Sequence, residues 1–307
     1  MKFKQFMRDT EEAVRNEIPE VLREEITVEI IEVMKTNDEI LHGLRMNIPG
    51  KNSMPTVYLE DCYKEFKNGM DLKKIAEMII ELSVEAYKNA PEYADISLEY
   101  EDIRDNLIVQ LLDGDMNSEH LKELVYKSVG NGFVMIAYIV ISEADGNCMR
   151  TAVTKSMAEQ FGYDVDAVMD VALLNTIERF EPVFCDLADL CDTGKAHRLL
   201  NPMNEEFEIA PDRGMYFLSN SLYRDGASAL FYPFVAERIG ELLDDNYYVL
   251  PSSLHEVIIV PASTGLTIAD MKNMVKDANC TVVDKRDILS NKVLLYDRIS
   301  NNLFITE

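Results

Sequence analysis

The sequence has few basic residues for its length, and this shortage excludes two classes of binding protein. It contains 30 Lys and Arg against 55 Asp and Glu, which gives a formal net charge of −25 and an isoelectric point near 4.5. Nucleic acids and anionic membranes bind proteins through clustered Lys and Arg. We therefore expect no direct nucleic-acid binding and no membrane partner. The excess of carboxylates indicates either simple solubility or an acidic face that binds a basic protein.

Long apolar runs are also missing. The longest, residues 132–141 (GFVMIAYIVI), has ten residues and is typical of a buried strand, because a membrane-spanning helix needs about 20. Residues 1–17 become acidic before the apolar region of a signal peptide could form. We therefore expect a cytoplasmic protein.

Cysteine is sparse and has no pattern. The five cysteines are scattered and odd in number, which argues against a disulfide framework and favours reduced thiols. Cys185, Cys191 and His197 have five residues between each successive pair, wider than the usual C-x₂₋₄-C spacing of zinc sites. We expect neither a metal nor a cofactor.

Apolar periodicity predicts an α+β protein with largely antiparallel sheets and packed helices. Helical spacing favours helices over 3–16, 60–67, 71–88, 100–112, 118–124, 154–161, 164–179, 233–243 and 267–278. Alternating or continuous apolar residues favour strands over 26–34, 39–46, 56–59, 132–142, 148–153, 215–220, 227–232, 247–250 and 256–260. The sequence thus predicts an N-terminal α+β region over residues 1–200 and a C-terminal ββαββα region over 201–307, divided within the irregular stretch 180–203.

Ser253 and His255 are the candidate catalytic residues, with Ser252 beside them. In an extended segment their side chains share one face, and a serine activated by histidine is a nucleophile when an acid orients the ring. However, neighbours on one short strand rarely reach the geometry of a triad, and no G-x-S-x-G motif is present. The alternative is a Pro-Ser-Ser turn in which His255 makes local hydrogen bonds.

Asp113, Asp115 and Asn117 resemble the start of a calcium loop. The sixth position is Ser118 in place of glycine, and the twelfth is Leu124 in place of glutamate. A polar turn is therefore the favoured interpretation. Residues 192–195 (DTGK) lack the rest of a phosphate-binding loop, so we expect no nucleotide site there.

Three segments resemble an uncharacterised family of domain-of-unknown-function proteins from gut Firmicutes, often encoded near mobile elements. They are 55–72 (PTVYLEDCYKEFKNGMDL), 215–233 (MYFLSNSLYRDGASALFYP) and 247–262 (YYVLPSSLHEVIIVPA), of which LPSSLHEVIIVP is the most specific. The resemblance covers most of the chain. It implies a bacterial cytoplasmic setting and a link to mobile-element biology, and it supplies no catalytic residue.

Two hypotheses for function follow. The first is a non-enzymatic interaction protein whose acidic face binds a basic protein, in its sharpest form a nucleic-acid mimic that blocks a host-defence factor. Clustered carboxylates such as Asp95, Glu99, Glu101 and Asp102 would carry the binding. The second is a hydrolase that uses Ser253 and His255. The charge favours the first, and the sequence leaves the oligomeric state open.

Overall fold

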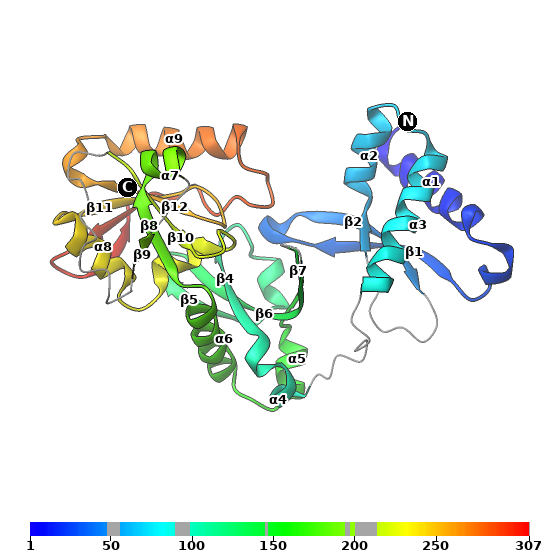
Figure 1. Ribbon diagram of the computed structural model, residues 1–307, viewed down its shortest axis with the longest axis horizontal. Helices are drawn as coiled ribbons and strands as arrows, with labels where there is room; N and C mark the ends of the chain where they lie inside the picture. The colour runs from blue at the N-terminus through cyan, green and yellow to red at the C-terminus, as the bar shows by residue number, and fades with distance from the viewer. Residues whose placement is uncertain (48–55, 90–98, 145–146, 194–196, 200–213, 307) are drawn as a thin grey trace. The chain divides into compact units, whose positions relative to one another are not determined.

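A computed structural model describes the chain except for residues 48–55, 90–98, 145–146, 194–196, 200–213 and 307 (Figure 1). The chain forms two compact units. Unit 1 comprises Met1–Lys35 and Glu39–Ser97, and unit 2 comprises Thr36–Asp38 and Leu98–Glu307.

The described part of unit 1 places helices on one face of a small antiparallel sheet. Its elements are α1 (Phe3–Glu17), β1 (Thr27–Met34), β2 (Ile40–Asn47), β3 (Thr56–Tyr58), α2 (Leu59–Lys67) and α3 (Leu72–Asn89). β2 lies between β1 and β3, and the three strands predicted over 26–34, 39–46 and 56–59 are confirmed. Asp71 caps α3, because its Oδ1 accepts the backbone N–H of Lys74 at 2.8 Å.

Amphipathic helices hold unit 1 together. Phe6 and Val14 of α1 and Ile75 and Ile79 of α3 are fully buried, and they pack with Leu44 of β2 in one apolar cluster. The helical spacing of these residues aligns them on the buried face of each helix. Burying an aliphatic or aromatic side chain contributes about 1.5–3 kcal/mol, so this cluster is the main stabilising element of the unit.

The first part of unit 2 is a four-stranded antiparallel sheet with helices against it. Its described elements are α4 (Tyr100–Ile103), β4 (Leu107–Asp113), β5 (Tyr126–Gly130), β6 (Phe133–Ala144), β7 (Asn147–Ala152), α5 (Lys155–Phe161) and α6 (Val165–Arg179). The long strand β6 pairs with β4 along one side and with β5 and then β7 along the other.

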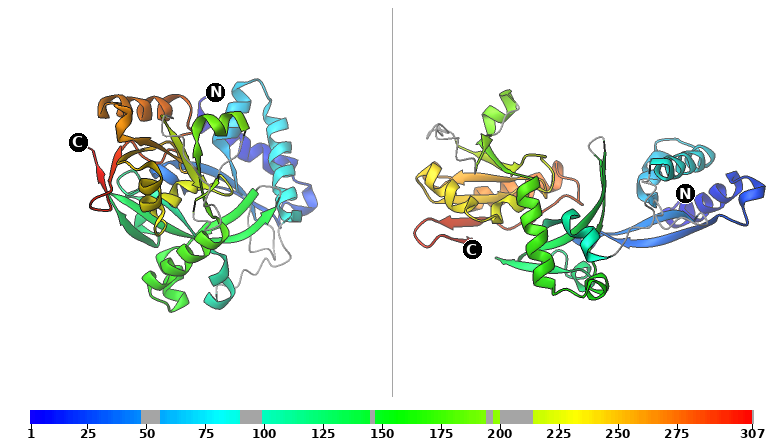
Figure 2. Two further views of the ribbon diagram at one scale, coloured as in Figure 1. Left: turned by 60° about the vertical axis from the view of Figure 1, so that its left-hand side comes forward. Right: turned by 60° about the horizontal axis from the view of Figure 1, so that its bottom comes forward.

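The second part of unit 2 is a seven-stranded sheet whose pairings are antiparallel, in the order β14-β13-β11-β12-β10-β8-β9. Its described elements are β8 (Pro182–Asp186), α7 (Leu187–Thr193), β9 (His197–Arg198), β10 (Tyr216–Asn220), α8 (Val235–Leu243), β11 (Tyr247–Pro251), β12 (Val257–Pro261), α9 (Ile268–Thr281), β13 (Leu294–Asp297) and β14 (Asn302–Ile305). Helix α9 covers one face through Met271 and Val275, which pack on Leu250 and Val260 (Figures 1 and 2).

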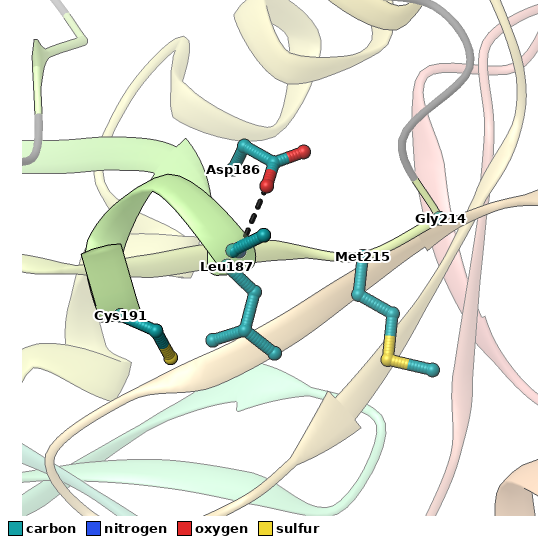
Figure 3. A pocket seen from close by; sticks show the side chains of 6 residues that line it. Asp186, Leu187, Cys191, Gly214 and Met215 are labelled. Carbon is teal, nitrogen blue, oxygen red and sulfur yellow. Dashed lines mark hydrogen bonds between the residues drawn. The ribbon is translucent and has the colours of Figure 1, made fainter. Parts of the chain in front are cut away.

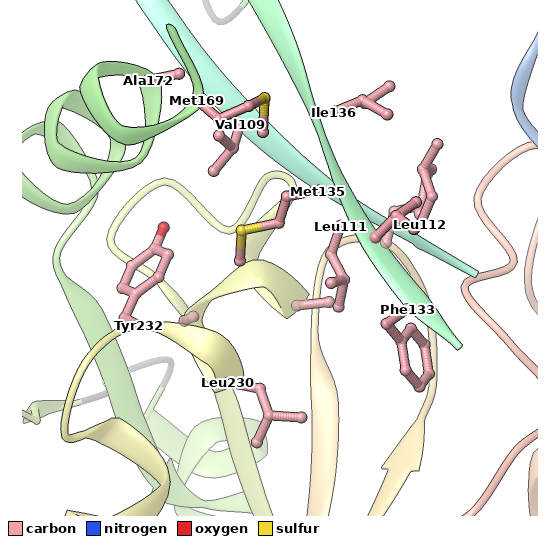
Figure 4. Packing of buried hydrophobic residues seen from close by; sticks show 14 of the residues in the cluster. Val109, Leu111, Leu112, Phe133, Met135, Ile136, Met169, Ala172, Leu230 and Tyr232 are labelled. Atoms are coloured by element: carbon pink, nitrogen blue, oxygen red, sulfur yellow. The ribbon is translucent and has the colours of Figure 1, made fainter. Parts of the chain in front are cut away.

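The two sheets of unit 2 share one core. Val109 and Met135 lie on the side of the four-stranded sheet that faces Leu230 and Tyr232 (Figure 4), and these residues belong to a single buried cluster with Tyr247 of β11. Burial raises the pKa of the Tyr232 phenol to about 12. The core therefore joins segments from both halves of unit 2.

The α+β class and the antiparallel sheets are confirmed, but two predicted elements are wrong. Residues 107–112, the larger part of the helix predicted over 100–112, belong to β4 (Leu107–Asp113). All seven residues of this strand are buried, and burial on both faces removes the alternation that reveals a strand. Residues 227–232, predicted as strand, lie mostly in a 3₁₀ helix (Gly226–Phe231). The C-terminal region therefore lacks the second strand of the predicted ββαββα order.

Two smaller differences lie between β4 and β6. In the segment 118–124, predicted as helix, only His120–Lys122 is helical, as a single 3₁₀ turn. Strand β5, which follows it, was not predicted, because Tyr126, Lys127 and Ser128 are exposed and show no apolar alternation.

The predicted boundary near residue 200 falls in 200–213, outside the described residues, and stays a prediction. The compact units divide elsewhere, after Ser97. β8 and β10 lie on either side of residue 200 in sequence and pair directly, with Leu218 opposite Phe184. Residues before and after the predicted boundary thus belong to one sheet.

Candidate functional site

Ser253 and His255 lie in the short connection between β11 and β12. Ser253 is 5% exposed, and its Oγ accepts the backbone N–H of His255 at 2.9 Å. The Ser253 N–H donates to the carbonyl of Glu256 at 3.2 Å. The hydroxyl thus fixes the turn, and the contact it makes with His255 runs through the backbone. A catalytic role of this pair stays a prediction.

The imidazole of His255 contacts two aspartates. Its Nδ1 accepts the backbone N–H of Asp225 at 3.1 Å, and its Nε2 lies 3.8 Å from Asp287 Oδ1. Because Nδ1 accepts a hydrogen bond, the neutral ring carries its proton on Nε2. In that state Nε2 is a donor facing Asp287, and it becomes a partner in an ion pair once the ring is protonated.

Asp225 is the centre of a buried polar cluster that joins the two sheets. Its backbone is left-handed, with φ of 55°, and the residue is 7% exposed. One carboxylate oxygen accepts from Gln110 Nε2 at 2.5 Å, and the other pairs with the guanidinium of Arg150. Arg150 also lies over the ring of Tyr138, 4.2 Å from its centroid. A buried carboxylate needs such partners, because an unpaired buried charge is strongly destabilising.

Gly226 allows these segments to approach one another. A Cβ at this position would lie 2.1 Å from Ser219 Oγ and 2.6 Å from both the Asn220 nitrogen and the His255 carbonyl oxygen. The same carbonyl accepts the Ser219 hydroxyl at 2.7 Å. Only a residue without a side chain brings the end of β10 this close to the His255 turn.

A second feature is an open apolar pocket of about 560 Å³ beside α7. Its described lining is Asp186, Leu187, Ala188, Cys191, Gly214 and Met215. In Figure 3, the side chains of Leu187, Cys191 and Met215 face one side, and the Asp186 carboxylate points away from them. Asp186 Oδ1 accepts hydrogen bonds from the N–H groups of Ala188 and Asp189, so this carboxylate caps the N-terminus of α7.

The Asp113–Asn117 turn holds an ammonium group. Lys292 Nζ lies 2.8 Å from Asp113 Oδ1 and 2.9 Å from Asp115 Oδ2. Asn117 Nδ2 donates to the carbonyl of Asp113 at 2.8 Å, and Ser290 Oγ donates to Asp113 Oδ2. The carboxylates that resembled the start of a calcium loop therefore face a lysine of the same chain.

The cysteine positions offer no assembled metal site among the described residues. Cys185 is buried, which raises its pKa to about 12, and Cys191 is exposed. The side chain of His197 lies outside the described residues. Within the described part of the chain, His, Cys, Asp and Glu form no group of three or more that could hold a metal ion. No described helix is both long and apolar enough to span a bilayer.

Six exposed carboxylates lie on two neighbouring segments, α4 with the turn after it and the start of α6. We name them together the acidic face; it comprises Glu101, Asp102, Asp105, Asp164, Asp166 and Asp170. Tyr163 connects the two parts, because its ring stacks on Tyr100 and its hydroxyl donates to Glu101 at 3.1 Å. Arg104 and Lys127 each lie near two of these carboxylates. Of the carboxylates suggested by the sequence, Glu99 is also exposed here, and Asp95 lies outside the described residues.

Sequence reasoning missed the cluster around Asp225. Gln110, Arg150 and Asp225 are up to 115 positions apart, and no short motif links them. The one local signal is the dipeptide Asp225-Gly226, which is typical of a turn and does not indicate a buried polar cluster.

Comparison with known proteins gives a family and no activity. No curated protein and no solved structure matches the chain. The profile of a family of unknown function, DUF5688, matches residues 3–298, and the chain therefore belongs to this family.

Proposed function

We propose that the chain is a non-enzymatic binding protein whose acidic face contacts a basic protein. The observation that carries this proposal is the presence of six exposed carboxylates on two neighbouring segments of unit 2, with Arg104 and Lys127 as nearby cations. The net charge of −25 adds a long-range attraction for a cationic partner and a repulsion for nucleic acid.

The composition of the acidic face fits recognition of Arg- or Lys-rich surfaces. The side chains of Asp105 and Asp166 are 89% and 73% exposed, so a partner can contact both carboxylates without any rearrangement of the chain. Tyr163 and Leu174 add exposed aromatic and apolar area at 44% and 60% exposure. Charged groups around an aromatic contact are typical of interfaces that form rapidly and depend on salt.

A finer version of the proposal follows from the resemblance seen in the sequence. In it, the chain is a bacterial cytoplasmic accessory of a mobile element, and the acidic face imitates nucleic acid to occupy a basic defence factor. This version predicts competition between the chain and a nucleic acid for the same basic protein.

The test uses two triple charge reversals and a poly-arginine peptide as the probe. One variant changes Asp164, Asp166 and Asp170 of the acidic face to Lys; the matched control changes the exposed Glu20, Glu24 and Glu25 of unit 1 to Lys. We expect the first to weaken peptide binding at low salt about tenfold more than the control does, a difference of about 1.4 kcal/mol. Equal losses of affinity in both variants would show that peptide binding depends on net charge alone, and would overturn the proposal.

The hydrolase that uses Ser253 and His255 remains the alternative. Its support is the position of an acid, Asp287, 3.8 Å from the imidazole. Against it stands the hydrogen bond from the His255 backbone to the Ser253 hydroxyl. Labelling by a serine-reactive fluorophosphonate probe that is lost in Ser253→Ala, with Ser252→Ala as control, would favour the enzyme over the binding protein.

A further inference from the structure

Two arginines form ion pairs with the carboxylate of Glu143, near the Asp225 cluster. Arg179, at the end of α6, places Nη2 2.8 Å from Glu143 Oε2. Arg224, in the turn after β10, places Nη2 3.0 Å from Glu143 Oε1. Each guanidinium therefore takes one oxygen of the same carboxylate, which is the arrangement that bridging phosphate and carboxylate ligands adopt between arginines.

A third arginine lies near this pair. Asp225 follows Arg224 directly in the chain, and its carboxylate pairs with the guanidinium of Arg150. The guanidinium groups of Arg150, Arg179 and Arg224 thus lie in one part of a chain whose formal net charge is −25.

Glu143 belongs to a weakly supported part of the sheet. β4 pairs with β6 only as far as Ile139, and the pairing of β6 with β7 shifts register between Val140 and Ser142. Beyond that bulge, Glu143 is paired only with Cys148 of β7. A two-stranded ribbon is marginally stable by itself, so this carboxylate can leave the arginines without disrupting the core.

The arginines are accessible while Glu143 holds them. The side chains of Arg179, Arg224 and Glu143 are 30%, 28% and 33% exposed. The guanidinium of Arg179 also lies over the ring of Phe180, which is buried, with its central carbon 5.4 Å from the ring centroid. Packing of this kind orients a guanidinium in advance and lowers the entropy lost when it binds an anion.

We propose that Arg179 and Arg224 form a binding site for a phosphate or carboxylate group, and that Glu143 is an internal ligand that the anion displaces. This site is independent of the acidic face and goes beyond the proposed function. Binding separates Glu143 of β6 from Arg179 and Arg224 and exchanges intramolecular ion pairs for intermolecular ones. No bond is made or broken in the step.

Removing the internal ligand tests the proposal. Glu143→Gln keeps the size of the side chain and removes its charge. We expect this variant to bind inorganic phosphate at least tenfold more tightly than the wild-type chain in isothermal titration calorimetry, and Arg224→Gln added to it to abolish the gain. Arg104→Gln added to it instead is the control, since Arg104 also contacts two carboxylates, Glu101 and Asp105, on the acidic face. Acetate, titrated in parallel, distinguishes a carboxylate site from a phosphate site.

A folded Glu143→Gln chain that binds neither phosphate nor acetate overturns the proposal. If that variant does not fold, the wild-type chain is titrated with phosphate while the Arg side-chain Nε–H signals are followed by NMR. Saturable shifts of the Arg179 and Arg224 signals, assigned from the single Arg→Gln variants, support the site. The absence of such shifts, or equal shifts of the Arg104 signal, overturns it.

Discussion

The backbone N–H of Asp225 donates a hydrogen bond to Nδ1 of His255, and the two atoms are 3.1 Å apart. This bond joins the turn after β10 to the connection between β11 and β12. It leaves the Asp225 carboxylate for Arg150 and Gln110, and it directs His255 Nε2 toward Asp287. A single backbone group thus sets the tautomer of the imidazole and the direction in which its proton points.

Gly226 is the position where this arrangement is most sensitive to substitution. In Gly226→Ala the new methyl group meets Ser219 Oγ and two backbone atoms, so β10 and the His255 turn must separate. We expect the free energy of unfolding to fall by about 3 kcal/mol or more, measured by urea denaturation. Gly214→Ala is the control, because a Cβ there meets nothing within 4 Å. Equal stability of both variants would contradict the close approach.

Ser253 has a structural task that can be measured apart from any catalysis. Ser253→Ala removes the acceptor of the half-buried His255 N–H, and we expect it to lower the free energy of unfolding by about 1–2 kcal/mol. Ser252→Ala serves as the comparison, and we expect a change below about 0.5 kcal/mol. A neutral Ser253→Ala would show that the hydroxyl does not fix the turn.

Lys292 neutralises a buried acid. In Lys292→Met the carboxylate of Asp113, which is 2% exposed, loses its cation, and we expect the chain to lose about 3 kcal/mol of stability. Lys122→Met is the matched control, since Lys122 pairs with Glu119 at the surface, and it should cost less than about 1 kcal/mol.

The same ion pair gives stability a dependence on alkaline pH. Burial lowers the pKa of Lys292, but the hydrogen bonds to Asp113 and Asp115 and the negative charges of these carboxylates together raise it by more, so the pKa lies above the ordinary 10.5. A cation whose pKa is raised by folding stabilises fully below its unfolded pKa, and this contribution is lost as the pH rises through the folded value. We expect unfolding free energies, measured from pH 9 to about pH 12, to fall above about pH 10.5 more steeply in the wild-type chain than in Lys292→Met.

The cysteines should differ widely in reactivity. Cys191 and Cys280 are exposed, whereas burial raises the pKa of Cys62 to about 11 and that of Cys185 to about 12. Because the thiolate is the reactive form, a disulfide reagent at pH 8 should label Cys191 and Cys280 in the native chain and Cys62 and Cys185 only after unfolding. Rapid native labelling of Cys185 in a Cys191→Ser variant would place it at the surface and contradict its position in β8.

Local patterns predicted much of the architecture. The two long strands of unit 1 followed from alternating apolar residues. The helix predicted over 267–278 is α9, which Thr267 caps, and Asp270 completes the cap by accepting the Thr267 N–H. Each of these depends on residues a few positions apart. By contrast, β4 was mistaken for helix because both of its faces are buried, and a strand without a solvent face shows no alternation.

The candidate sites divide in the same way. Ser253 and His255 were visible because they are neighbours in sequence, but their role depends on Asp225 and Asp287, which lie about 30 residues away on either side. The clusters around Asp225 and Glu143 were not visible, since Gln110, Arg150, Arg179 and Arg224 carry no shared motif.

The sequence by itself determined the charge of the chain, the α+β class and those helices and strands whose apolar residues follow one period, because such properties depend on composition and on near neighbours. Only the tertiary structure decided three contacts: the ion pair of Lys292 with Asp113, the hydrogen bond from the Asp225 N–H to His255, and the ion pairs of two arginines with Glu143. These contacts join residues 30 to 179 positions apart. Chain folding sets such distances, and no local preference of a residue encodes them.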